Sequence, residues 1–267
     1  MRMTRRISVV GIDGCGKSTV LDRFLELVRG ADVAGLTCPQ YHRTPDAPLA
    51  RLSERLDEFS RAADSLGSFE LKATALFLQM TLYGPVERFA LETFRPAFLL
   101  SERHALVDSL AYGPFYVQMV RQNPDRARFE PALRGRLAWD DIVRWQSLRS
   151  ERSIWDLALE VRDLFRLPFR ETVRALGREY GTTLPDVLLL LDVDVPTALE
   201  RLSRRAEAEL HENGAVLEQL RRSYLGTIEA LRREHPEVEV HVVRGGAGVD
   251  ETLHEVLARS GMTAAMR

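Results

Sequence analysis

Five short apolar runs are spaced along the chain, and longer stretches of helical periodicity separate them. The runs are rich in valine, isoleucine and leucine, and glycine, proline or polar residues bound them, as is typical of strands. They occupy residues 7–10, 33–38, 96–101, 184–191 and 238–243. Because strands that alternate with helices form parallel sheets, this pattern predicts an α/β fold: a doubly wound parallel sheet of about five strands, flanked by helices.

Between these runs, apolar residues recur at helical spacing. The predicted helices cover residues 18–29, 47–65, 69–94, 196–208, 214–235 and 250–260, and helical segments fill most of residues 106–180. Pro85 predicts a kink in the helix over 69–94. In the long helical region the expected interruptions are Pro114, Asn123-Pro124, Pro131, Pro168 and Gly181. The sequence contains no internal repeat, and we expect one domain over residues 1–267.

The turn between the first strand and the first helix matches the pattern G-x-x-x-x-G-K-[ST] of a phosphate-binding loop. It reads Gly11-Ile12-Asp13-Gly14-Cys15-Gly16-Lys17-Ser18-Thr19. Glycines let successive backbone N–H groups turn inward around an anion, and the new helix adds its positive dipole end. We expect Lys17 to face phosphate and solvent, where it reaches the β- and γ-phosphates of a nucleotide, and the Ser18 hydroxyl to bind Mg²⁺. The alternative is a glycine-rich turn that carries a lysine by chance.

Composition narrows the classes of protein. The chain has 267 residues, 45% hydrophobic and 28% charged, as in ordinary globular proteins. Its net charge of −2 gives no sign of a nucleic-acid surface, and no run approaches the roughly 18 apolar residues of a membrane span. The basic N-terminus lacks the apolar stretch of a signal peptide. Cys15 and Cys38 do not have a metal-ligand spacing, so we expect a reduced, cytoplasmic protein without nucleic-acid or membrane partners.

Four stretches together resemble the thymidylate kinase family. The phosphate loop is similar to that family's G-I-D-G-x-G-K-S-T, and residues 102–112 resemble its D-R-Y…D-S-S-x-A-Y segment. Residues 184–202 resemble its L-P-D…L-D-V…A-L-E-R run, and residues 217–225 resemble the helix after its lid. The resemblance covers residues 5–112 and 184–260. It implies a P-loop NTPase-type fold, ATP and Mg²⁺ as cofactors, and phosphoryl transfer to dTMP or a related pyrimidine monophosphate.

The resemblance also implies roles for single residues. Asp13 corresponds to a carboxylate that contacts the sugar 3′-hydroxyl, and Phe77 to an aromatic that stacks on the base. Arg103, at a strand end, is placed to bind the acceptor phosphate, and Glu102 to orient the acceptor or the Mg²⁺ shell. The implied nucleotide-binding set is Gly11, Asp13, Gly14, Cys15, Gly16, Lys17, Ser18, Thr19 and Arg201. The implied acceptor-binding set is Asp13, Arg43, Phe77, Arg103 and Tyr112.

A lid-like segment over residues 201–215 is expected to close over the nucleotide through its arginines. The expected catalytic set is Lys17, Asp13, Glu102, Arg103, Arg204 and Arg205. Asp192 either supports Mg²⁺ through water or is a plain acid at a strand end. Simpler interpretations also stay open: a surface ion pair for Glu102 and Arg103, a core position for Phe77, and a solvated helix face for the lid arginines.

Three departures from the family leave the acceptor open. The family has an arginine a few residues after the stacking aromatic, where it contacts thymine, and this chain has none at that place after Phe77. The family also has an arginine directly beside the proline after the second strand, and here Arg43 is the candidate substitute. A mainly helical insertion at 115–183 exceeds what the family needs. Its aromatics either cover the acceptor pocket or form a homodimer interface; they are Phe115, Tyr116, Trp139, Trp145 and Trp155. One alternative is a kinase of deoxynucleosides or other small molecules, because Glu102-Arg103 resembles the E-R-S segment of deoxynucleoside kinases. The other is a regulatory nucleotide-binding protein without catalysis.

Overall fold

The computed structural model describes residues 3–28, 32–204, 214–245 and 248–262. Within these residues, five strands form one parallel sheet with the order β2-β3-β1-β4-β5. The strands are β1 (Arg5–Val10), β2 (Val33–Thr37), β3 (Phe98–Glu102), β4 (Val187–Asp192) and β5 (Glu239–Arg244). The interior strand β4 reads Val-Leu-Leu-Leu-Leu-Asp because helices cover the sheet on both faces and bury every residue of the strand except the last. The predicted fold class is confirmed.

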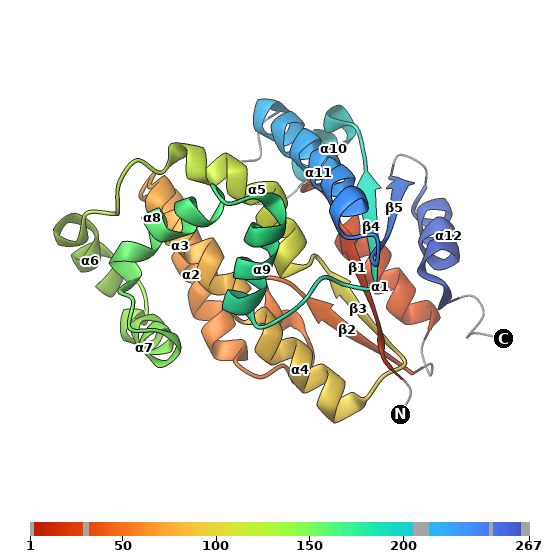
Figure 1. Ribbon diagram of the computed structural model, residues 1–267, viewed down its shortest axis with the longest axis horizontal. Coiled ribbons are helices and arrows are strands. Elements are labelled where there is room, and N and C mark those ends of the chain that lie inside the picture. The colour runs from red at the N-terminus through yellow and green to blue at the C-terminus, as the bar shows by residue number, and fades with distance from the viewer. Residues whose placement is uncertain (1–2, 29–31, 205–213, 246–247, 263–267) are drawn as a thin grey trace.

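Two groups of helices cover this sheet (Figure 1). Helices α1 (Lys17–Leu27) and α12 (Val249–Ser260) pack against each other on one face. Helices α5 (Ala105–Met119) and α11 (Gly214–Glu234) pack together on the other face, and α4 (Tyr83–Phe94) lies beside β2. Helix α10 (Val195–Leu202) follows β4 at its carboxyl end. The carboxyl ends of β1, β2 and β3 therefore meet at one edge, where open parallel sheets bind ligands.

A second helical layer extends from the α5 side of the sheet (Figure 1). It contains α2 (Ala50–Ser65), α3 (Phe69–Met80), α6 (Arg126–Arg134), α7 (Trp139–Arg149), α8 (Leu157–Leu164) and α9 (Phe169–Tyr180), with single turns at Tyr41–Arg43 and Ile154–Asp156. Trp139 is buried in this layer, with its ring 5.2 Å from Phe59 and 5.5 Å from Trp155. Trp145 donates to Thr81 Oγ1 at 3.1 Å. These three tryptophans therefore make contacts between helices of this layer.

The structure corrects three expectations about proline. The segment 69–94 is two helices that separate at Thr81 and Leu82, and Pro85 lies in the first turn of α4, where its missing N–H is not needed. Pro114 and Pro131 do not interrupt helices; they lie inside α5 and α6. Each costs one backbone hydrogen bond, and the buried side chains of the two helices offset that loss.

The other three predicted interruptions are confirmed. Asn123-Pro124 lies between α5 and α6, Pro168 precedes α9, and Gly181 ends α9 in the left-handed conformation with φ 66°. Among the described helices, none combines the length and apolar character needed to cross a membrane.

Candidate active site

The phosphate loop joins β1 to α1 at the carboxyl edge of the sheet. Gly14 has φ 79°, and a Cβ on it would lie 2.5 Å from the backbone oxygen of Ala198 in α10. A larger residue would therefore force the loop away from α10 as well as strain its backbone. Arg201, also on α10, donates to the Gly14 and Cys15 oxygens at 3.3 and 3.2 Å and to the Gly245 oxygen at 3.2 Å. Helix α10 thus supports the loop from outside.

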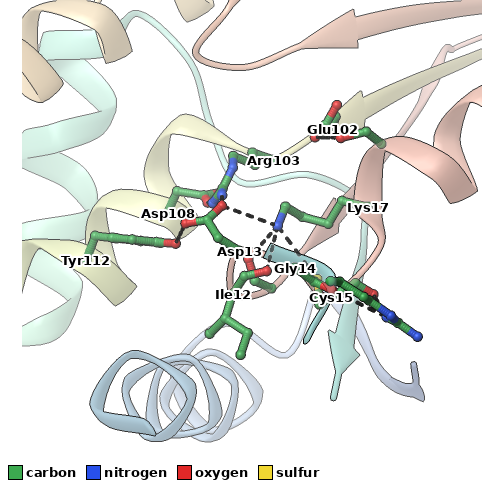
Figure 2. A network of polar contacts seen from close by, with 12 residues as sticks. Ile12, Asp13, Gly14, Cys15, Lys17, Glu102, Arg103, Asp108 and Tyr112 are labelled. Carbon is green, nitrogen blue, oxygen red and sulfur yellow. Dashed lines mark hydrogen bonds and ion pairs between the residues drawn. The ribbon is translucent and has the colours of Figure 1, made fainter. Parts of the chain in front are cut away.

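Lys17 differs from the expectation that its side chain faces solvent. The side chain is only 5% exposed, and Nζ donates to the backbone oxygens of Gly11 and Ile12 at 2.9 and 2.8 Å. Its Nζ also lies 4.0 Å from Asp13 Oδ1 (Figure 2). The ammonium is therefore held within the loop by groups that a phosphate oxygen can replace, and it still lines the adjoining cavity.

Two oxygen-bearing side chains meet where α1 begins. Ser18 Oγ donates to Glu102 Oε1 at 2.6 Å, which joins the loop to the last residue of β3. A hydroxyl and a carboxylate are hard oxygen ligands, and Mg²⁺ in kinases completes its shell with phosphates and water. The donor set therefore fits a magnesium ion, although no group of three or more acidic, histidine or cysteine side chains gathers for a metal among the described residues.

Asp192 has a different environment from the one proposed for a metal-supporting acid. Its carboxylate accepts two hydrogen bonds from Arg221 of α11, with N–O distances of 2.6 and 2.8 Å. Asp192 is not among the described residues that line the cavity beside the phosphate loop. The structure therefore gives it an ion-pair role between β4 and α11.

Arg103 lies at the centre of a polar network (Figure 2). It directly follows β3 and has φ 64°, and its guanidinium forms ion pairs with Asp13 of the phosphate loop and with Asp108 of α5, the latter at 2.7 Å. Tyr112 donates to the other Asp13 oxygen at 2.8 Å, and Tyr224 of α11 donates to Asp108 at 2.5 Å. The phosphate loop, α5 and α11 thus together fix one arginine.

Burial and charge compete at Arg103. Burial lowers the pKa of its guanidinium, whereas Asp13, followed by Tyr112, Tyr224 and Asp108, raises that pKa, and the net pKa lies well above the ordinary arginine value. Asp108 is 2% exposed and also accepts from the His104 backbone N–H at 2.8 Å. The carboxylates therefore keep Arg103 charged and aimed in one direction, which is what a residue that binds an anionic or polar group requires.

One cavity of about 730 Å³ connects the phosphate loop with these groups. Of the predicted site residues, the structure brings together at this cavity Asp13, Gly14, Gly16, Lys17, Ser18, Thr19, Arg43, Phe77, Glu102, Arg103, Tyr112, Arg201 and Arg204. Phe77 is 3% exposed and its ring lies 5.7 Å from that of Tyr180, so it is both a core residue and a wall. Gly11 and Cys15 belong to the loop but are not among the described lining residues.

The lid-like segment is described only at its two ends, residues 201–204 and 214–215. Arg204 lines the cavity, but its side chain is 73% exposed and pairs with Glu200 at 2.6 Å, as a solvated helix face would. Arg205 and residues 206–213 lie outside the described residues.

Several cavity residues have no clear signal in the sequence. Asp108, Ser109 and Tyr180 line the cavity, as do Val161 and Phe165 of the helical insertion. Gln79 is 2% exposed, and its Oε1 has no hydrogen-bond partner among the described residues. The sequence signal for Asp108 and Ser109 is their place in the segment that resembles D-S-S-x-A-Y, which by itself assigned them no role. Tyr116 is the one aromatic of the five proposed from the insertion that lines the cavity.

Comparison with known proteins defines the fold. No protein-family model and no curated protein matches this chain. Among solved structures, the chain is similar to a deoxyadenosine kinase from M. mycoides, solved with the products dCMP and a flexible dCDP bound. The TM-score is 0.52 and the identity 13%, and the match covers 95% of this chain and 97% of that one. At this identity the likeness shows the fold alone, a P-loop NTPase-type parallel sheet flanked by helices, and gives no particular support to a thymidylate kinase.

Proposed function

We propose that this protein is an ATP- and Mg²⁺-dependent kinase that phosphorylates a hydroxyl group of a nucleoside. The observation that carries the proposal is the single cavity in which the phosphate loop and the polar network of Arg103 face the same space. Phosphoryl transfer needs the donor and the acceptor held together more than it needs reactive groups. The fold shared with a deoxyadenosine kinase is consistent with this reaction.

In the proposed reaction, the acceptor hydroxyl oxygen attacks the γ-phosphorus, and the bond to the ADP oxygen breaks. Lys17 binds the β- and γ-phosphates, and the proton of the hydroxyl passes to a carboxylate. Glu102 and Asp13 are suited to that role because both line the cavity, one through a contact with Ser18 and the other from within the loop. Mg²⁺, held by Ser18 and Glu102, would neutralise the phosphate charge.

The charges beside the acceptor favour a nucleoside over a nucleoside monophosphate. Four carboxylates line the cavity, and one of them, Asp13, belongs to the phosphate loop. Outside that loop and residues 201–204, the described lining has three acids and two bases; the acids are Asp57, Glu102 and Asp108, and the bases Arg43 and Arg103. Since Arg103 is already shared by two carboxylates, a doubly charged phosphate would meet net negative charge there. A neutral acceptor does not.

A thymidylate kinase is the second candidate, because Arg103 stands where that family binds the acceptor phosphate and Asp13 where it binds the 3′-hydroxyl. Release of ADP decides between the two. It should be measured with Mg²⁺, ATP and a panel of deoxynucleosides alongside their 5′-monophosphates, dTMP included. We expect the largest kcat/KM with a deoxynucleoside; a larger value for dTMP would favour the second candidate. Nucleotide binding without turnover of any acceptor would instead favour a regulatory protein.

A further inference from the structure

A second cavity adjoins the cavity beside the phosphate loop and Arg103, which is named the acceptor cavity from here on. Its volume is about 690 Å³, and it lies between the last turn of α5 and the end of α8. The described residues that line it are Val117, Gln118, Met119, Val120, Arg121, Arg162, Phe165 and Arg166. Val117 and Phe165 also line the acceptor cavity. These two side chains therefore stand between the two cavities.

Phe165 is held in this place by a glycine. It directly follows α8, and its ring rests against Gly113 in the middle of α5. A Cβ on Gly113 would lie 2.1 Å from Cζ of the ring, so only glycine leaves room for the phenyl group at this position. The ring thereby reaches the backbone of α5 between Tyr112 and Tyr116, which also line the acceptor cavity.

The two cavities differ in charge. The second cavity is lined by three arginines and by no acid among the described residues. Asp163 pairs with Arg162 at 3.0 Å and with Arg166 at 3.1 Å, so one negative charge offsets part of this positive charge. The acceptor cavity instead mixes its four carboxylates with Lys17 and four arginines. A group that passed Phe165 would thus leave a surrounding of both charges for one lined by basic side chains alone.

We propose that Phe165 is a specificity-determining residue that sets the upper size of the acceptor. Its ring closes the acceptor cavity on the side of the helical insertion and shuts off the arginine-lined cavity behind it. The wild-type protein therefore rejects acceptors with a bulky substituent directed at α8. Without the ring the two cavities join, and the combined space best suits a substituent that is aromatic and negatively charged. This inference rests on the proposed kinase function.

The test compares Phe165→Ala with the wild type on matched acceptors. They are the best deoxynucleoside acceptor and its derivatives with a benzyl or a carboxybenzyl group, attached to the base or to the 3′-oxygen. Because one methylene in an apolar pocket changes selectivity by about 10-fold or more, loss of the ring should raise the derivative-to-parent ratio of kcat/KM at least that far. The carboxybenzyl derivative should gain more than the benzyl one. Leu167→Ala is the control, because Leu167 lies on the same loop, is 39% exposed and does not line either cavity.

An unchanged ratio in folded Phe165→Ala for both attachment points overturns the proposal, and so does an equal gain in Leu167→Ala. If Phe165→Ala does not fold, Phe165→Leu keeps an apolar contact with α5, and the same ratio decides. If the wild type phosphorylates no nucleoside, the proposed function has failed. The size limit is then measured separately by calorimetric binding of the parent and its derivatives, where only the ring-truncated variant should bind the bulky compounds.

Discussion

Replacing Arg103 by alanine should destabilise the protein, in addition to any effect on catalysis. The Asp13 and Asp108 side chains are 15% and 2% exposed, so the substitution leaves two carboxylates in a buried site without their shared cation. Removing one partner of a buried ion pair costs about 3–5 kcal/mol. Asp13 keeps its bond from Tyr112, and Asp108 keeps those from Tyr224 and the His104 N–H. We therefore expect the lower end of that range.

Backbone strain does not complicate this prediction. The φ of 64° at position 103 disfavours alanine and arginine alike, because both carry a Cβ. Urea denaturation at pH 7 measures the change in the free energy of unfolding, provided that the slope stays the same. Arg221→Ala is the matched control, because Arg221 also forms two charged hydrogen bonds, here to Asp192. The Arg221 and Asp192 side chains are more exposed, at 31% and 20%, so this ion pair should contribute about 1 kcal/mol or less to stability.

A second substitution separates charge burial from lost packing. Asp13→Asn in the Arg103→Ala background removes an unpaired charge, while its amide oxygen still accepts from Tyr112 and its NH2 group faces the space that the guanidinium leaves. The double variant should therefore be more stable than Arg103→Ala alone, which gives a measurable coupling energy between the two positions. The reasoning fails if Arg103→Ala loses no more stability than Arg221→Ala, or if Asp13→Asn further destabilises the Arg103→Ala variant.

Three further predictions concern the loop, the metal and pH. Lys17→Ala should abolish ADP release, because the cation that binds the β- and γ-phosphates in the proposed reaction is lost; retained activity would contradict the site. Ser18→Ala should raise the Mg²⁺ concentration for half-maximal activity, and an unchanged Mg²⁺ titration would remove Ser18 from the metal site. Burial lowers the pKa of His104 from 6.5 to about 3, so protonation opposes folding and stability is lost as pH falls from 6.5 towards 3, by up to about 1.4 kcal/mol per unit. His104→Asn, which keeps an N-cap acceptor, should lose stability less steeply in urea titrations between pH 7 and 5, and an equal slope would assign the acid loss to other groups.

Features under the control of short-range chemistry could be predicted from the amino-acid sequence. The five apolar runs predict the five strands because β-branched and apolar residues bounded by turn residues favour strands wherever they occur. The phosphate loop is recognised locally as well, since its pattern spans nine residues and Lys17 binds oxygens within it. Proline was a weaker signal, because packing within α5 and α6 outweighs one lost hydrogen bond at Pro114 and Pro131.

The contacts between side chains that are distant in the sequence depend on long-range packing and could not be predicted from local patterns. Tyr224 and Asp108 are 116 residues apart, and Ser18 and Glu102 are 84 apart, yet each pair forms a hydrogen bond. The pairing follows from the order of the strands and from how α11 packs on α5, which no local pattern encodes. The same holds for Phe165, whose position depends on a glycine in another helix. A residue's type and spacing predict its chemistry, whereas long-range packing decides where that chemistry is placed.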